Sequence, residues 1–253
     1  MLETRKLTIR FGGHVAVDQV SCAFRPGTLT AIVGPNGAGK TTYFNLISGQ
    51  LPASEGQVLL DGEDLTRLSA PLRTRKGLGR AFQLTQLFPH LTVLENVRLA
   101  IQARRGLGLR MLSVWLQHRE LLDEAMAVLG QVRLEGKAQS VAASLPHGDQ
   151  RKLEVAMLIA LDPKVYMFDE PTAGMSVDEV PVILDLIRAL KARGEHTILL
   201  VEHKMDVVRE LADRIIVLHQ GQLVADGEPA AVIASPVVQN AYLGLDVAEE
   251  AVA

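Results

Sequence analysis

Nine consecutive residues carry the strongest chemical signal in this chain: Gly34-Pro35-Asn36-Gly37-Ala38-Gly39-Lys40-Thr41-Thr42. Two glycines with four residues between them, followed by lysine and a hydroxyl residue, are typical of a loop that binds phosphate groups. Glycine lets the backbone turn its N–H groups toward an anion, and a helix that begins here points its positive end at the same place. Lys40 adds a cation for the β- and γ-phosphates, and Thr41 adds a hydroxyl group for Mg²⁺. The sequence therefore predicts a nucleotide site at this phosphate loop.

Two adjacent acids, Asp169 and Glu170, follow an apolar segment at residues 165–168. Ligands of open α/β sheets bind at the carboxyl ends of the strands, which is where this pair would lie. Because adjacent strand residues point to opposite faces, the two acids can have different roles. We expect Asp169 to hold Mg²⁺, directly or through water, and Glu170 to orient and deprotonate an attacking water.

A histidine and an aromatic residue are further candidates. His203 comes just after the apolar segment at residues 197–201, so it would lie at the nucleotide end of the same sheet. There it could bond the γ-phosphate and respond to its presence. Phe11 precedes a Gly12-Gly13 turn. This position fits either an aromatic ring stacked on adenine or a core residue at the edge of a sheet.

The elements that must position these residues follow from hydrophobic periodicity and turn residues. Strands are predicted at residues 7–11, 20–24, 29–33, 57–60, 165–170, 197–201, 214–219 and 223–225. Helices are predicted at residues 41–48, 91–103, 114–132 and 176–193. Ser176 and Glu179 have the spacing of a capping box at the start of the last helix. The fold class is α/β, with an antiparallel β region around the phosphate loop.

The chain is expected to form one nucleotide-binding domain, residues 1–253, with a helical insertion. Residues 1–82 and 158–240 would form the core with its β subdomain, and residues 83–157 a helical subdomain in which strand signals fade. Residues 241–253 would form a C-terminal tail.

Composition narrows the function classes. The 253 residues carry a net charge of −3, which argues against a general grip on nucleic acid. The single cysteine, Cys22, allows no internal disulfide and is expected to be a small core residue. The sequence shows no secretory leader and no apolar run of the length of a membrane span. We therefore expect a cytosolic protein whose membrane role, if any, goes through a partner.

Taken together, the phosphate loop, Gln83, the acidic pair and His203 resemble the ATP-binding-cassette (ABC) ATPases over nearly the whole chain. This resemblance implies a P-loop fold with a RecA-like core, an antiparallel β subdomain and an inserted helical subdomain. It implies ATP and Mg²⁺ as ligands, with Phe11 on the adenine ring. Gln83 would touch Mg²⁺ and the attacking water and would link the site to a membrane partner. Cassettes of this kind work as head-to-tail dimers.

The segment that matches the family signature L-S-G-G-Q departs from it. Here it is Leu145-Pro146-His147-Gly148-Asp149, which we call the signature turn. Pro146 replaces a serine that would donate a hydroxyl and an N–H group to the partner's ATP. Asp149 suits the N-terminal end of a helix but not a nearby triphosphate. The signature turn is therefore expected either to bind the partner's ATP weakly or to use other donors, such as His147. The loop after the second acid, residues 173–176, also lacks the aspartate that many cassettes carry.

A narrower resemblance is to the longer ATPase subunit of branched-chain amino-acid importers. It rests on residues 81–83, 87–97, 173–175, 201–205 and 241–244. It implies membrane permeases, a second ABC ATPase and, indirectly, an external solute-binding protein as partners, at the cytoplasmic face of a bacterial inner membrane. Related systems import amides or urea, so the resemblance implies the family and a small polar solute as cargo.

Three other functions share some of these sequence features. A lipid or lipopolysaccharide export ATPase shares several local patterns, and a non-hydrolysing regulatory subunit is suggested by the signature turn but opposed by Glu170. A soluble cassette of DNA repair or translation would carry a second cassette, long coiled-coil insertions or basic patches, none of which is found here.

Overall fold

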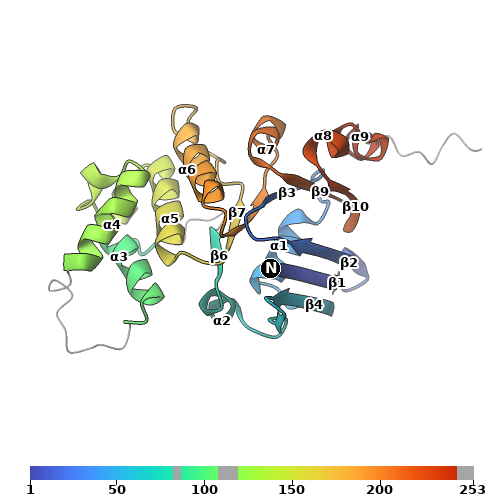
Figure 1. The fold of residues 1–253 in the computed structure, drawn as a ribbon, viewed down its shortest axis with the longest axis horizontal. Coiled ribbons are helices and arrows are strands. Elements are labelled where there is room, and N and C mark those ends of the chain that lie inside the picture. Colours follow the sequence, from blue (N-terminus) through green and yellow to red (C-terminus); the bar gives the residue numbers. More distant parts are fainter. Residues whose placement is uncertain (82–86, 108–118, 244–253) are drawn as a thin grey trace, which may run out of the picture.

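The structure is a computed structural model that describes residues 1–81, 87–107 and 119–243. Two β-sheets lie side by side, and a group of helices extends from one side of them (Figure 1). Within these three ranges, no helix combines the length and the apolar character needed to cross a bilayer.

The first sheet is antiparallel and has the strand order β2-β1-β4-β5. Its strands are β1 (Leu2–Phe11), β2 (His14–Phe24), β4 (Glu55–Leu60) and β5 (Glu63–Asp64). β1 and β2 are joined by the Gly12-Gly13 turn and are both longer than predicted. Their register is irregular at several points, which interrupts the simple alternation of apolar and polar residues. The sequence prediction therefore missed the first halves of both strands.

The central sheet has the order β10-β9-β3-β8-β7-β6. All neighbouring strands are parallel except the β9–β10 hairpin. The strands are β3 (Leu29–Val33), β6 (Leu78–Ala81), β7 (Val165–Asp169), β8 (Thr197–Val201), β9 (Arg214–His219) and β10 (Gln222–Gly227). Only β6, which is four residues long and contains Gly79 and Arg80, was not predicted. β3, β7 and β8 are buried along their whole length, as central strands of a covered parallel sheet should be.

Strand β7 shows how the core is divided between the two faces of this sheet. Tyr166 and Phe168 belong to a large cluster that includes the helices, whereas Val165 and Met167 belong to a cluster shared with the antiparallel sheet. Side chains alternate along a strand, so Asp169 continues the row of Val165 and Met167. The acid is thereby directed toward the helix that follows the phosphate loop, and its side chain is fully buried.

The helices are α1 (Lys40–Ser48), α2 (Ala70–Arg75), α3 (Val93–Arg104), α4 (Arg119–Gln131), α5 (His147–Leu161), α6 (Val180–Ala192), α7 (Met205–Leu211), α8 (Pro229–Ile233) and α9 (Pro236–Leu243). Short 3₁₀ helices, η2 (Glu135–Lys137) and η3 (Ala142–Ser144), precede α5. α3, α4 and α5 pack together at one side of the molecule (Figure 1). The buried residues of α4 are Leu121, Ala125, Val128 and Leu129, which recur along one face at helical spacing.

The sequence predicted that a helix begins at Ser176 with a capping box formed by Ser176 and Glu179. This prediction is wrong, because α6 begins at Val180 and its N-cap is Glu179. Ser176 donates its hydroxyl to the Glu179 carboxylate, which leaves no side-chain cap on the helix. The other oxygen of this carboxylate accepts a bond from Lys152 of α5 at 3.0 Å, so Glu179 joins the start of α6 to α5 in addition to its local bond. A complete capping box occurs instead at Thr92 and Glu95, before α3.

A buried arginine holds the far end of α1. The guanidinium of Arg73, which is 2% exposed, donates to the carbonyl oxygens of Leu46 and Ile47 in the last turn of this helix, at 2.6 and 2.7 Å. It also donates to the carbonyls of Thr66 and Leu68, next to the antiparallel sheet. Burial lowers the pKa of Arg73. A cation at the negative end of a helix is favourable, so α1 is fixed behind the phosphate loop.

Candidate nucleotide site

A hollow of about 350 Å³ lies at the phosphate loop. Two of its lining residues, His14 and Ala16, were not predicted. The other nine are predicted site residues: Asn36, Gly37, Ala38, Gly39, Lys40, Thr41, Thr42, Glu170 and His203. The loop, the end of β7 and the segment after β8 thus meet at one place, although Asn36 and His203 are 167 positions apart in the sequence.

The backbone of the loop demands glycine at two points. At Gly34 the φ angle is +150°, and a Cβ atom would lie 2.1 Å from the carbonyl oxygen of Leu218. At Gly39 the φ angle is +95°, and a Cβ atom would lie 2.5 Å from the carbonyl oxygen of Ala16. Any side chain at either point would meet backbone, which cannot easily move. These contacts also explain why the start of β2 lines the hollow.

Lys40 lies folded back along the loop. Its ammonium group donates to the carbonyl oxygens of Gly34 and Pro35, at 2.7 and 2.8 Å. Burial lowers its pKa, and the negative charges of Glu170 and Asp169 oppose that shift. Among the described residues, no carboxylate lies within ion-pair distance of this ammonium group. Its positive charge therefore remains available to an anion in the hollow.

Asp169 forms an ion pair with Arg80, at 2.7 Å between Oδ2 and Nη2. Arg80 also donates to the side chains of Asn45 and Ser48 on α1, so it joins β6, β7 and α1. Burial raises the pKa of Asp169, and the nearby Arg80 opposes that rise. The other carboxylate oxygen, Oδ1, is buried without a hydrogen-bond partner in the described part of the chain.

A buried carboxylate oxygen with no donor fits a site that takes a cation. A hydroxyl group, from Thr41, lines the adjoining hollow. Oxygen ligands of this kind suit Mg²⁺, which usually keeps several waters and one or two protein ligands beside phosphate oxygens. The residues present are therefore compatible with the predicted Mg²⁺. Gln83, the third predicted ligand, lies outside the described residues.

Glu170 and His203 are in direct contact. The distance between Oε1 of Glu170 and Nε2 of His203 is 2.6 Å. The φ angle of Glu170 is +48°, a left-handed conformation that is costly for a residue other than glycine. This turn ends β7 and directs the carboxylate into the hollow. Strain of this kind persists only where neighbouring contacts hold it, and it often marks a functional residue.

Arg151, a buried residue of α5, supplies part of that support. Its guanidinium donates to the carbonyl oxygens of Asp169 and Glu170, at 2.8 and 3.0 Å. It also forms an ion pair with Glu154, at 2.6 Å. The helix that begins at the signature turn is therefore bound to the backbone of the two acids.

Phe11 is not a core residue, because half of its surface is exposed. It lies at the end of β1, opposite His14 in the hairpin register. His14 and Ala16 line the hollow, but Phe11 does not. Its predicted contact with adenine remains a proposal. The Gly12-Gly13 turn, which singled out Phe11, could also have indicated His14 and Ala16 as site residues. The chain that follows this turn runs back past the phosphate loop.

The signature turn is built differently from the phosphate loop. The side chain of Leu145 packs in the main core. Pro146 is the N-cap of α5, and His147 is exposed. Asp149 is 6% exposed and forms ion pairs with Lys137 and Lys152. Burial raises its pKa, but the bonds from the two lysines outweigh burial and lower it overall.

Cys22 is buried and unpaired, as predicted.

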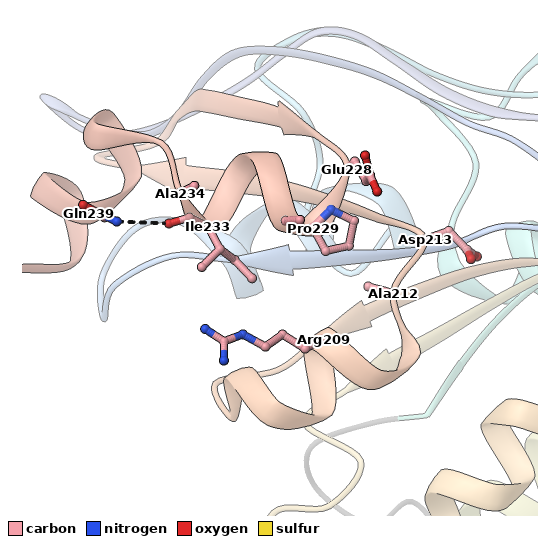
Figure 2. Close-up of a pocket in the computed structure, with 9 residues that line it drawn as sticks. Arg209, Ala212, Asp213, Glu228, Pro229, Ile233, Ala234 and Gln239 are labelled. Carbon is pink, nitrogen blue, oxygen red and sulfur yellow. Dashed lines mark hydrogen bonds between the residues drawn. The ribbon is translucent and has the colours of Figure 1, made fainter.

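A larger hollow, of about 730 Å³, lies between α7, α8 and α9 (Figure 2). It contains none of the residues that the sequence singled out, and its lining mixes Arg209 with Asp213 and Glu228. Figure 2 shows Gln239 of α9 donating to the carbonyl of Ile233, at 3.5 Å.

A phosphate loop between a central parallel strand and a helix, with an acid at the end of another strand of that sheet, defines the class of P-loop nucleotide-binding proteins. A sequence model of the ABC transporter family matches residues 17–173. The chain belongs to this family of ATP-binding cassettes, as the resemblance implied.

Two curated relatives cover nearly the whole chain. One, from Pseudomonas aeruginosa, is the high-affinity branched-chain amino acid transport ATP-binding protein BraF, 37% identical over 96% of this chain and 98% of the relative. Another, from Escherichia coli K12, is the high-affinity branched-chain amino acid transport ATP-binding protein LivG, 38% identical with the same coverage. The expected narrower resemblance is thereby confirmed.

Solved structures agree with the fold. An ATP-binding cassette of an ABC transporter in its ADP conformation has a TM-score of 0.81 and 31% identity, covering 96% of this chain and 98% of that one. A cassette in a dimeric post-hydrolysis state, bound to ADP and Pi, has a TM-score of 0.78 and 26% identity, covering 90% of this chain and 99% of that one. The α/β cassette fold predicted from the sequence is confirmed.

Proposed function

We propose that this chain is the ATP-hydrolysing subunit of a membrane importer of branched-chain amino acids or related small polar solutes. One observation carries the proposal: the contacting Glu170 and His203 share a hollow with the phosphate loop. A chain that only bound nucleotide would not need a strained carboxylate at this point. The cargo is suggested by BraF and LivG, to which the chain is similar over nearly its full length.

Each residue has a proposed role. Lys40 and the N-terminal end of α1 bind the β- and γ-phosphates, while Phe11 lies against the adenine ring. When bound, Mg²⁺ neutralises phosphate charge, and Thr41, Asp169 and Gln83 would hold it. Glu170 accepts a proton from the attacking water, and His203 fixes Glu170 and the γ-phosphate relative to one another. The leaving group is ADP.

The proposed partners are membrane permeases, a second cassette and, indirectly, an external solute-binding protein. The chain would lie at the cytoplasmic face of a bacterial inner membrane. A head-to-tail dimer would bring the signature turn of one subunit to the ATP of the other. The dimeric form of a similar cassette supports this arrangement. The proposal includes both a homodimer of this chain and a heterodimer with a different cassette.

The first test is purification of the tagged chain from its native membranes in mild detergent, with the co-purifying chains identified by mass. We expect permeases and a cassette. Recovery of ribosomal or DNA-bound material without any membrane protein would contradict the transport role. A Glu170→Gln chain, carried through the same purification, controls for assembly because its surface is almost unchanged.

The cargo needs a separate measurement. Cells that express the wild-type chain are compared with cells that express Glu170→Gln for uptake of radiolabelled leucine, urea and a short amide. Leucine uptake that falls only in the variant supports the proposed cargo. Loss of urea or amide uptake instead would assign a related solute. Equal uptake of all three in both strains would contradict an importer of these solutes.

A further inference from the structure

A second buried carboxylate lies next to the catalytic pair. Glu202, the residue after β8, is only 4% exposed. Its Oε1 atom accepts the hydroxyl of Thr172 at 2.7 Å. Its Oε2 atom accepts the backbone N–H groups of His203 and Lys204, at 2.9 and 3.3 Å. No lysine or arginine in the described ranges forms an ion pair with it.

Such a group is expensive to bury. Removing a carboxylate from water is unfavourable unless hydrogen bonds replace its hydration. In the described part of the chain, Glu202 meets this condition with neutral donors from two separate segments, a hydroxyl group and two backbone N–H groups. An uncharged residue of similar size could fill the same space without that cost in hydration. The position of Glu202 therefore calls for an explanation beyond packing.

The two segments are the ones that carry the catalytic pair. Thr172 follows Glu170 by two residues, and His203 is adjacent to Glu202. Two side-chain contacts therefore join the same two segments: the Glu170–His203 contact, at 2.6 Å, and the Thr172–Glu202 hydrogen bond. On the strand side, the backbone N–H of Glu170 donates to the carbonyl of Val201 at 2.9 Å.

The left-handed backbone of Glu170 needs such restraint. With φ at +48°, this residue would relax toward an ordinary conformation if the chain after it were free. Arg151 holds the carbonyl side of the turn, and Thr172 lies on the chain that leaves it. Thr172 is itself 1% exposed, so its hydroxyl has no access to water as an alternative partner.

We propose that Glu202 is a positioning residue that joins the two catalytic segments and sets the Glu170–His203 contact. It touches no reacting atom; it acts through Thr172 on one side and through the His203 backbone on the other. The proposal rests on the proposed function, because it assumes that Glu170 and His203 act in ATP hydrolysis.

The test uses the full chain, alone and in its membrane complex, with kcat, KM and ATP affinity measured separately. Thr172→Val removes one hydroxyl at constant shape, and we expect kcat to fall about tenfold with ATP affinity unchanged. Thr172→Ser restores the hydroxyl and should restore kcat. Glu202→Gln should lower kcat by a similar or larger factor. Glu195→Gln, an exposed glutamate before the other end of β8, is the matched control and should have no effect.

A double-mutant cycle separates positioning from general stability. In a His203→Ala background, Glu202→Gln should change kcat less than twofold, because the contact that it sets is already lost. The proposal would be overturned if the effects of Glu202→Gln and His203→Ala on kcat were independent and simply multiplied. It would also be overturned if a folded Thr172→Val chain had normal kcat, or if its ATP affinity fell in parallel with kcat. A wild-type chain that does not hydrolyse ATP would refute the proposed function and this proposal with it. An active wild type with unaffected variants would refute this proposal alone.

Discussion

The phosphate loop and the signature turn both lead into a helix, yet they treat charge in opposite ways. In the phosphate loop, the described partners of the Lys40 ammonium group are neutral carbonyl oxygens, so its positive charge adds to that of the helix end. In the signature turn, Asp149 is bound by Lys137 and Lys152, and Lys152 also reaches Glu179. The first region keeps its charge for a ligand. The second uses its charges to fix α5 against its neighbours.

This difference bears on how each region would bind ATP. The phosphate loop can offer a cation and a helix end to the triphosphate of its own subunit. Among the described residues of the signature turn, the imidazole of His147 is exposed, whereas Gly148 is buried against the Glu179 carboxylate. We infer that the ATP affinity of one subunit is set mainly by its own phosphate loop.

The largest expected effect is that of Lys40→Ala. Loss of the ammonium group should weaken ATP binding by about 100-fold or more, because a charged hydrogen-bond donor to phosphate is removed. Titration with a fluorescent ATP analogue measures this. Lys137→Ala, a change to the lysine of the other region, should leave ATP binding nearly unaltered. Wild-type affinity in Lys40→Ala would mean that the phosphate loop is assigned wrongly.

Glu170→Gln should separate binding from hydrolysis. The amide keeps the size of the side chain but cannot accept a proton, so turnover should fall by about 10²–10⁴ while ATP still binds. Since ATP then persists, we also expect a dimer to accumulate, visible by size-exclusion chromatography with ATP. Unchanged turnover would show that Glu170 is not the base.

Pro146→Ser examines the signature turn directly. A serine would restore an N–H group and a hydroxyl group at the N-cap of α5. If the signature turn limits the reaction, ATP turnover of the dimer should rise by about two- to tenfold. An equal rate in the two proteins would indicate that His147 or the partner subunit already supplies the missing donors.

The smallest effect is expected for Asp149→Asn, which breaks both ion pairs of the signature turn. The lowered pKa of Asp149 means that its stabilisation is present above its unfolded pKa of about 3.9, and is lost as the pH falls through the lower folded value. The variant should be less stable by about 1 kcal/mol at pH 7, with the difference disappearing in strong acid. Thermal melts from pH 7 down into strong acid, at about pH 2, measure it. A constant difference at all pH values would show that the ion pairs are not its cause.

The parts of the site that sequence could predict are those encoded by neighbouring residues. The phosphate loop fixes its own backbone through Gly34 and Gly39, and an apolar strand followed by Asp169 and Glu170 fixes where these acids lie. β7 and β8 are long enough and apolar enough to be recognised as buried strands.

What could not be predicted depends on which distant residue becomes a partner. Arg80 and Asp169 are 89 residues apart, and nothing in either local sequence indicates their ion pair. Ser176 and Glu179 have the same spacing as Thr92 and Glu95, but only the second pair caps a helix. Lys152, on another helix, takes part of the Glu179 carboxylate, and local spacing contains no information about that competition.

Arg73 has a consequence for hydrogen exchange. The last turn of an isolated helix frays, because its carbonyl oxygens have no partners within the helix. In α1 the carbonyls of Leu46 and Ile47 are held by a guanidinium that is also bound to Thr66 and Leu68. The end of α1 can therefore open only when its attachment to the antiparallel sheet region opens too. Amide protons in this turn should exchange at the slow rate of that larger cooperative unit, rather than at the fast rate of a fraying helix end.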